Sequence, residues 1–163
     1  MIKHIPGHGR ATADSHLALP RVTASVDELS AHDFVTFRGL NHAPLAMTAH
    51  VVYEAIDPQR PATTSSKIIH RIIRGEIGFD GLLITDDLSM KALSGSLAER
   101  ARLALEAGCD VALHCNGVLS EMEEVAAAAG SLSKPAAGMR YLRAMRRLRH
   151  LLEPGGEAET EGS

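Results

Sequence analysis

The first sixteen residues carry side chains that could move a proton. Asp14 stands two residues before His16, in the stretch ATADSH. A carboxylate at this spacing can orient an imidazole ring and raise its basicity, as an aspartate does behind a histidine general base. Pro6 and Gly7 favour a sharp turn just before this pair. The sequence therefore predicts an acid/base loop near the start of the chain.

The same stretch also allows a metal site. His4, His8 and His16 with Asp14 form a plausible set of metal ligands. Their spacing matches no strong zinc-binding signature, and the glycines on both sides of His8 indicate a demand of the backbone. A purely structural histidine-rich turn is the third interpretation. The spacing alone leaves all three open.

Asp86 is the second candidate for chemistry. It follows residues 81–85, GLLIT, where a buried strand would leave the apolar layer. A carboxylate held there by the backbone suits a nucleophile or a general base. The alternative is that residues 87–89 begin a helix, which Asp86 and Asp87 only cap. Both can hold, with Asp86 in the site and Asp87 near the helix start.

Short apolar runs predict the strands that position these residues. Runs at 45–52, 81–87 and 110–116, with a strand stub at 2–5, are typical of strands buried on both faces of a parallel sheet. Helical spacing of apolar residues predicts helices between and after them. These helices cover residues 26–40, 65–77, 97–107 (ending at Gly108), 119–129 and 137–152.

This alternation indicates an α/β fold with a parallel sheet, either doubly wound or a (β/α)8 barrel. Both architectures place their active sites at the carboxyl ends of the strands. Each predicted strand ends in polar residues, which would form one side of a shared active-site mouth. They are Lys3 and His4, then His50, then Asp86 and Asp87, then His114 and Asn116.

The arginines of the last helix are predicted to form a solvated face rather than a polyanion site. They are Arg140, Arg143, Arg146, Arg147 and Arg149, beside an apolar stripe that includes Leu142 and Met145. Residues 153–163 are rich in glycine and glutamate and are predicted to be a disordered acidic tail. The structured domain is then residues 1–152.

Composition excludes several classes of protein. The 163 residues are 45% hydrophobic and 23% charged, with a net charge of −3 and few aromatics. These values predict one globular domain and give no reason to expect nucleic acid. No stretch approaches the about 20 consecutive apolar residues of a membrane span. Cys109 and Cys115 are predicted to be free thiols, and no signal peptide is visible, so we expect a cytoplasmic protein.

Five motifs in order carry a resemblance to a known family. They are KHIPGHG, DSH, MTAHVVY, GEIGFDGLLITDDLSMKAL and AGCDVALHCN, all within residues 3–116, and the resemblance extends over residues 2–152. The chain resembles the family 3 glycoside hydrolases, in particular the bacterial cytoplasmic β-N-acetylhexosaminidases of cell-wall recycling. The resemblance implies a (β/α)8 barrel. It also implies a retaining hydrolase that removes terminal, non-reducing β-linked N-acetylglucosamine from muropeptides.

The resemblance implies roles for five residues. Asp86 of Thr85-Asp86-Asp87-Leu88-Ser89 matches the family nucleophile, and Lys3 and His4 match its sugar-binding pair. His16 matches the acid/base residue, with Asp14 as its partner. A histidine with a pKa near 6.5 can donate and accept a proton near neutral pH. The metal interpretation loses weight, and the resemblance implies no cofactor.

The length of the chain raises a second hypothesis, in which the protein is not an enzyme by itself. A (β/α)8 barrel has typically ~250 residues, and this chain carries about three and a half βα units, the C-terminal half. A half barrel leaves an open sheet edge. A missing N-terminal half or a second copy of the chain would complete it, giving an enzyme. Otherwise the chain is a truncated, non-catalytic fragment that needs a partner half.

Overall fold

A four-stranded parallel sheet forms the centre of the computed structural model, which describes residues 1–11, 19–130 and 135–152. The strand order is β1-β3-β5-β6, and each neighbouring pair is parallel. The strands are β1 (Ile2–Ile5), β3 (Leu45–Thr48), β5 (Leu82–Asp87) and β6 (Val111–Leu113). All four lie inside the predicted apolar runs, so the α/β class with a parallel sheet is confirmed.

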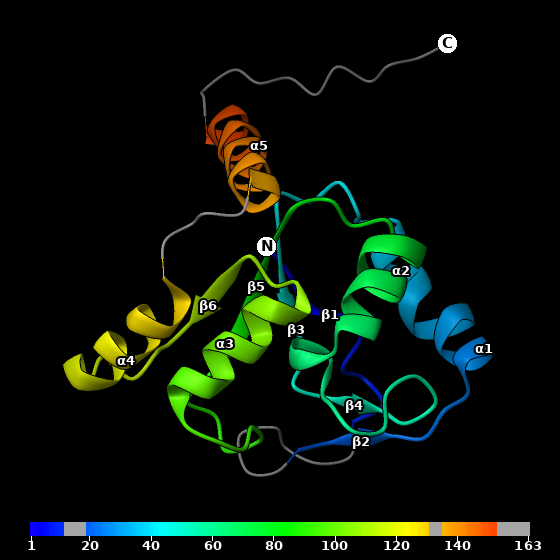
Figure 1. Ribbon diagram of the computed structural model, residues 1–163. Helices are drawn as coiled ribbons and strands as arrows, with labels where there is room; N and C mark the ends of the chain where they lie inside the picture. Colours follow the sequence, from blue (N-terminus) through cyan, green and yellow to red (C-terminus); the bar gives the residue numbers. More distant parts are fainter. Residues whose placement is uncertain (12–18, 131–134, 153–163) are drawn as a thin grey trace.

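Helical segments follow each of these strands, as in a (β/α) barrel (Figure 1). The first run joins α1 (Val26–Glu28), the π-helical stretch η1 (Leu29–Phe34) and α2 (Val35–Arg38). The second comprises the 3-10 turn η2 (Ala62–Thr64) and the π-helical stretch η3 (Ile68–Glu76). The others are α3 (Leu97–Ala107), α4 (Leu119–Ala129) and α5 (Pro135–Leu152). Every predicted helix is present.

Local sequence signals explain where two of the helices begin and end. Ser25 and Glu28 form a reciprocal capping box at the start of α1. The Ser96 hydroxyl accepts a hydrogen bond from the Glu99 N–H at the start of α3. Gly108 ends α3 at a φ of 122°, a conformation that favours glycine. These signals account for the correct bounds predicted for α3.

The main core lies between the sheet and the helices. Ile5, Ala46 and Leu83 from the strands pack in one buried cluster with Phe34 of η1 and Ile69 of η3. A second, smaller cluster joins Leu88, Leu93, Ala101 and Val125. The isoleucines that predicted the helix at 65–77 therefore form its buried face. Within the described residues, no helix has both the length and the apolar character needed to cross a membrane.

Two very short strands were not predicted. β2 (Arg21–Val22) pairs in parallel with β4 (Val52–Tyr53) as a separate two-stranded sheet. β4 follows β3 directly, and β2 follows the segment 12–18 after β1. This small sheet therefore joins the connections that leave the carboxyl ends of β1 and β3.

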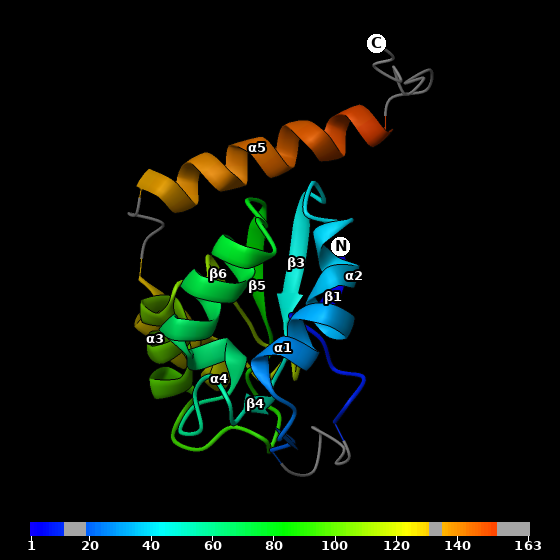
Figure 2. The same ribbon diagram turned by 90° about the vertical axis from the view of Figure 1, so that its right-hand side faces the viewer.

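The prediction of a solvated arginine face on α5 is wrong for Arg140, whereas Arg143 stays exposed. In Figure 2, α5 crosses the end of the sheet opposite to the end at which the β3 arrow points. Arg140 binds the buried Asp110 through two nitrogens, and Arg143 and Arg147 pair with Asp80. Two members of the predicted apolar stripe, Leu142 and Met145, are exposed, as are the neighbouring Met139 and Tyr141. The arginines are drawn to the carboxylates that precede β5 and β6.

Candidate active site

The carboxyl ends of the strands lie at the end of the sheet away from α5 (Figure 2). The sequence placed its candidate residues at these ends, and parallel strands bring such ends to one edge of a sheet. The structure describes three of the five predicted site residues, Lys3, His4 and Asp86. Asp14 and His16 lie in segment 12–18, outside the described residues.

A β-bulge sets the place of Asp86 in β5. The β5–β6 register shifts between Ile84, which pairs with Val111, and Asp87, which pairs with Leu113. β5 therefore holds one extra residue, and such a bulge re-aims the side chains within it. The Thr85 hydroxyl accepts the Leu113 N–H at 2.9 Å, so this donor keeps a partner at the irregularity.

His4 approaches Asp86 from β1. Its Nε2 lies 3.4 Å from Oδ2 of Asp86, and the side chains are 29% and 16% exposed, so the pair is open to a ligand. His4 also lies at a register shift, between Lys3 and Ile5 in the β1–β3 pairing. The His8 ring stands 5.6 Å from the His4 ring, centroid to centroid. Two motifs that lie far apart in the sequence thus meet at one place.

Lys3 precedes His4 on β1, and its side chain is exposed. It pairs with Met47 of β3 in the ladder, so it stands at the same end of the sheet as His4. An exposed ammonium group at this position is accessible to a ligand. The structure brings His4 of β1 to Asp86 of β5, and Lys3 is the neighbour of His4 on β1.

Segment 12–18 leaves and rejoins the described residues at anchored points. Before it, the Tyr53 hydroxyl donates to the Gly7 carbonyl, and Arg10 pairs with Asp33 at 2.7 Å. After it, the Pro20 carbonyl accepts the Val52 N–H at 2.9 Å, beside the β2–β4 pairing. The described residues on both sides of this segment are therefore held by hydrogen bonds or an ion pair.

Asp87 has a different role from Asp86. Its carboxylate accepts hydrogen bonds from the Ser89 hydroxyl at 2.5 Å, the Ser89 N–H at 3.0 Å and the Cys115 N–H at 3.2 Å. Partial burial acts to raise the pKa of Asp87, but these donors outweigh it and hold the pKa below its usual value. The alternative in which residues 87–89 begin a helix is wrong, because Asp87 ends β5, residues 88–89 form a turn and α3 begins at Leu97.

His50 is one of the polar residues at the strand ends, and the sequence assigns it no role in the site. It follows β3 and is fully buried. Its Nδ1 lies 2.7 Å from the Thr63 hydroxyl, and its Nε2 lies 3.0 Å from the Asp87 carbonyl oxygen. Burial lowers the pKa of His50, against the opposing effect of the Asp87 carbonyl and the carboxylates of Asp86 and Asp87. Both ring nitrogens of the buried His50 thus have a hydrogen-bond partner. No spacing of residues in the sequence indicates the contact between His50 and Asp87.

The polar residues after β6 bind one another rather than Asp86. His114 Nε2 lies 2.7 Å from Glu121 of α4, and the Asn116 amide donates to the same carboxylate at 3.1 Å. The Ser89 hydroxyl lies 3.1 Å from Asn116 Oδ1 and links this group to the turn after β5. His114 and Asn116 thus connect the end of β6 to α4 and to the turn after β5.

Only two of the four proposed metal ligands, His4 and His8, lie among the residues that the structure describes. Among residues 1–11, 19–130 and 135–152, no group of three His, Cys, Asp or Glu side chains is arranged to hold a metal ion. His4 and His8 belong to that part of the chain. Asp14 and His16, the other two proposed ligands, lie outside it.

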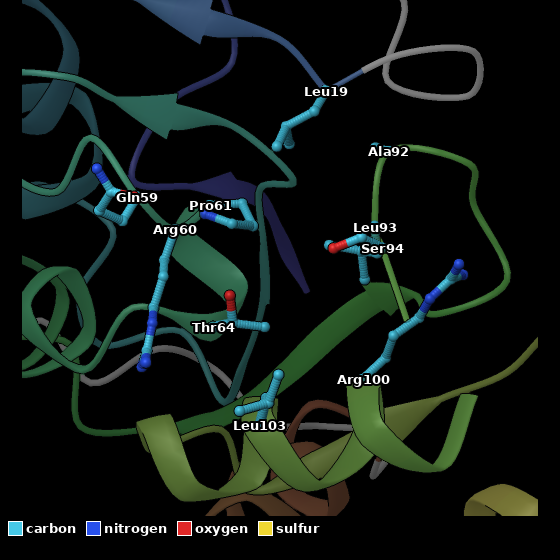
Figure 3. A pocket seen from close by; sticks show the side chains of 10 residues that line it. All are labelled: Leu19, Gln59, Arg60, Pro61, Thr64, Ala92, Leu93, Ser94, Arg100 and Leu103. Atoms are coloured by element: carbon cyan, nitrogen blue, oxygen red, sulfur yellow. The ribbon is translucent and has the colours of Figure 1, made fainter. Parts of the chain in front are cut away.

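A pocket of about 230 Å³ lies between the connections that follow β4 and β5 (Figure 3). Leu19, Pro61, Thr64 and Leu103 line it, together with Arg100. Arg100 donates to the Leu88 and Met90 carbonyls at 2.7 and 3.3 Å, so its charge fixes the turn after β5. None of the three described site residues lines this pocket.

Comparison with known proteins gives a consistent family. The family model described as the N-terminal domain of glycosyl hydrolase family 3 matches residues 1–150. The beta-hexosaminidase of Alkalilimnicola ehrlichii is 50% identical over 118 residues, which are 70% of this chain and 34% of that protein. The beta-hexosaminidase of Pseudomonas aeruginosa PAO1 is 46% identical over 117 residues, 70% of this chain and 35% of that protein.

Solved structures agree with the fold. A family 3 beta-N-acetylglucosaminidase from Paenibacillus sp. superposes with a TM-score of 0.73 at 35% identity, over 91% of this chain and 30% of that one. NagZ from Neisseria gonorrhoeae, in complex with N-trifluoroacetyl-D-glucosamine, superposes with a TM-score of 0.75 at 34% identity, over 94% of this chain and 46% of that one. The chain spans about a third, 34%, of the first curated relative it matches. The (β/α)-barrel type of fold is thereby confirmed, over part of a barrel.

Proposed function

The chain belongs to glycosyl hydrolase family 3, and from this premise we propose that it carries the catalytic residues of a retaining β-N-acetylhexosaminidase. The substrate would be a terminal, non-reducing β-linked N-acetylglucosamine. The observation that carries the proposal is the 3.4 Å approach of His4 Nε2 to Asp86 Oδ2 at the carboxyl ends of β1 and β5. The N-acetylglucosamine analogue in the Neisseria gonorrhoeae structure supports an amino sugar as the ligand.

Two displacements at the anomeric carbon make up the proposed reaction. In the first, the Asp86 carboxylate attacks that carbon, the glycosidic C–O bond breaks, and His16 gives its proton to the leaving oxygen. The product is a glycosyl ester on Asp86. In the second, neutral His16 takes a proton from water, the water oxygen attacks the anomeric carbon, and the bond to Asp86 breaks. Asp14 orients the His16 ring, while Lys3 and His4 bind sugar hydroxyls.

The surroundings of Asp86 suit a nucleophile. One of its oxygens, Oδ1, accepts the Asp87 N–H at 2.9 Å, which leaves Oδ2 on the side of His4. A carboxylate fixed by a backbone donor loses little conformational freedom when it reacts. Asp87 is a poor candidate for the same role because three donors already hold its carboxylate.

The natural substrate and the compartment belong to the same proposal. We infer muropeptides of cell-wall recycling as the substrate and the cytoplasm as the location, as the family resemblance implies. Cys109 is buried and Cys115 is exposed, and both are free thiols. Free thiols are typical of a reducing compartment, which supports this location.

The second candidate is a non-catalytic fragment. It is favoured by length, because the chain covers only 34% of the first curated relative. In this case the site residues would act only after a partner half, or a second copy of the chain, completes the barrel. The partner half would supply the βα units that precede β1.

The test is hydrolysis of an aryl β-N-acetylglucosaminide by the purified chain. We expect Asp86→Asn to lower kcat by at least about 1000-fold, as loss of a nucleophile does. The exposed Asp27→Asn is the matched control and should keep full activity. Activity that survives in Asp86→Asn would refute the assigned nucleophile.

Inactivity of the unaltered chain favours the fragment instead. The assay would then be repeated with an added polypeptide that carries the preceding βα units of a relative. Recovery of activity that Asp86→Asn again abolishes would establish the fragment hypothesis.

A further inference from the structure

His50 combines complete burial with a contact to the strand that carries Asp86. Its side chain has no exposed surface, and its two ring nitrogens bind Thr63 and the Asp87 carbonyl. A buried histidine with both nitrogens satisfied is usually a core residue. This one differs because its second partner is the residue directly after the proposed nucleophile.

The partners of His50 determine where its protons lie. A carbonyl oxygen only accepts, so the 3.0 Å contact with Asp87 requires a proton on Nε2. In the neutral ring, Nδ1 then accepts a hydrogen bond from the Thr63 hydroxyl at 2.7 Å. The Thr48 hydroxyl, 2.9 Å from that of Thr63, can donate to it in turn. The chain of hydrogen bonds therefore has one consistent direction.

A charged ring would keep the same contact with Asp87. Nδ1–H would then donate to Thr63, whose hydroxyl can turn to the Ala49 carbonyl at 3.1 Å. The groups that face His50 are Asp86 and Asp87 of β5, which favour the charged ring, and His4 of β1, which disfavours it. In both states the Nε2–H donates to the Asp87 carbonyl.

Asp87 transmits this contact to Asp86. Its N–H donates to Asp86 Oδ1 at 2.9 Å, and its carboxylate is held by Ser89 and the Cys115 N–H. Its carbonyl is held by His50. The backbone of residue 87 is thus fixed on both sides of its Cα, and the direction of the Asp86 carboxylate depends on it.

We propose that His50 is a positioning residue that holds the Asp87 backbone through Nε2–H and thereby aims the Asp86 carboxylate. Its catalytic consequence rests on the proposed function. The hydrogen-bond arrangement itself does not, so each part has its own test.

The first test determines the tautomer. Long-range ¹H–¹⁵N spectra of the full chain report which nitrogen of each histidine carries a proton, and His50→Gln identifies the His50 signal by its loss. We expect a neutral ring with the proton on Nε2 at pH 7. A proton on Nδ1 alone would overturn the proposal, whether or not the chain hydrolyses a glycoside.

The second test separates positioning from stability. His50→Leu removes the donor, whereas His50→Gln keeps an amide donor near the place of Nε2. Ser65→Ala is the control, because Ser65 is also fully buried and loses a 2.6 Å hydrogen bond to Asp57, away from β5. We expect His50→Leu to speed hydrogen exchange of the Asp87 amide about tenfold more than Ser65→Ala does at matched global stability. Equal exchange in the two variants would overturn the proposal.

The third test is kinetic and applies where the chain, alone or completed by a partner half, is active. We expect His50→Leu to lower kcat by up to about 100-fold with little change in KM, because the nucleophile is misaimed while the sugar still binds. His50→Gln should restore most of kcat, and Ser65→Ala should leave it unchanged. A kcat in His50→Leu that equals that of Ser65→Ala would show a core residue only. A protein that stays inactive even when a partner half is added, but gives the expected exchange result, refutes the proposed function and leaves the positioning contact intact.

Discussion

At the scale of single residues, two adjacent carboxylates at the end of β5 differ because their donors differ. Asp86 accepts one backbone N–H and faces His4. Asp87 accepts three hydrogen bonds and links the turn after β5 to β6. Two neighbouring residues therefore differ in role. The Asp86 carboxylate stands at the proposed site, whereas the Asp87 carboxylate holds the turn after β5.

The carboxylate of Asp87 should make stability depend on acid. Its lowered pKa means that the unfolded chain takes up the proton near pH 3.9 while the folded chain still resists it. Its contribution is complete above that pH and is lost as the pH falls further. We expect Asp87→Asn to lower the unfolding free energy by about 1 kcal/mol at neutral pH. Urea unfolding at several pH values measures this.

The loss caused by Asp87→Asn should be constant above about pH 4 and should shrink as the pH falls from about 4 to about 2. A loss that stays constant over this range would mean that the hydrogen bonds at Asp87 do not require its charge. Asp27→Asn, which changes an exposed carboxylate of α1, serves as the reference for a general effect of charge.

At the scale of elements, local signals and long-range pairings were predictable to different degrees. The bounds of α3 follow from Ser96 and Gly108, which act within one turn of the helix. β2 and β4 hold two residues each and are defined only by their pairing with each other. Two residues are too few to show an alternation of apolar and polar side chains, so the sequence does not predict these strands. The side of α5 that faces the protein depends on Asp80 and Asp110, which lie far away in the sequence.

The site shows the same division. Asp86 and His4 were predicted from their positions after apolar runs and from the family motifs, and the structure brings them together. His50 was noted as polar but its role was missed, because that role is a contact between the ends of β3 and β5. The roles of Asp14 and His16 stay predictions.

The contacts of α5 with the sheet should differ in strength. Asp110 is 1% exposed and binds Arg140, Arg74 and the Leu83 N–H. Arg143 and Asp80 are about half exposed. We expect Arg140→Ala to cost about 1–2 kcal/mol of unfolding free energy and Arg143→Ala less than about 0.5 kcal/mol. Chemical denaturation of both variants checks this, and equal costs would contradict the difference in burial.

The start of β5 depends on a close approach at Gly81. A Cβ there would stand 2.5 Å from the Ala43 carbonyl and 2.7 Å from the Pro44 carbonyl. Because both atoms belong to the backbone before β3, the strands would have to separate. We expect Gly81→Ala to lower the unfolding free energy by at least about 2 kcal/mol, a cost typical of forced overpacking. The open position Gly9→Ala is the control, since a Cβ there meets nothing within 4 Å.

At the scale of the whole molecule, α5 exposes several large apolar side chains. Met139, Leu142 and Met145 of α5 are 62%, 51% and 45% exposed. The match to this chain covers only 34% of the first curated relative. Exposed apolar faces of this kind mark surfaces that associate with other protein.

We therefore expect the purified chain to associate in a concentration-dependent manner. Sedimentation velocity across the micromolar range measures this. Leu142→Glu places a charge in the centre of the exposed stripe and should weaken the association. Val35→Glu, an isolated exposed position on α2, should not. A chain that sediments as a monomer at every concentration would contradict the expectation.

The register shifts in β1 and β5 make the number of residues in each strand a part of how the proposed site is built. Each strand holds one residue more than its neighbour between two points of pairing, and the two extra residues fall where His4 and Asp86 stand. Removing a single residue there would restore regular pairing while keeping almost every side chain of the strand. Insertions and deletions in these few positions should therefore be tolerated far less than substitutions, and any sequence alignment or redesign of the strands has to preserve their count.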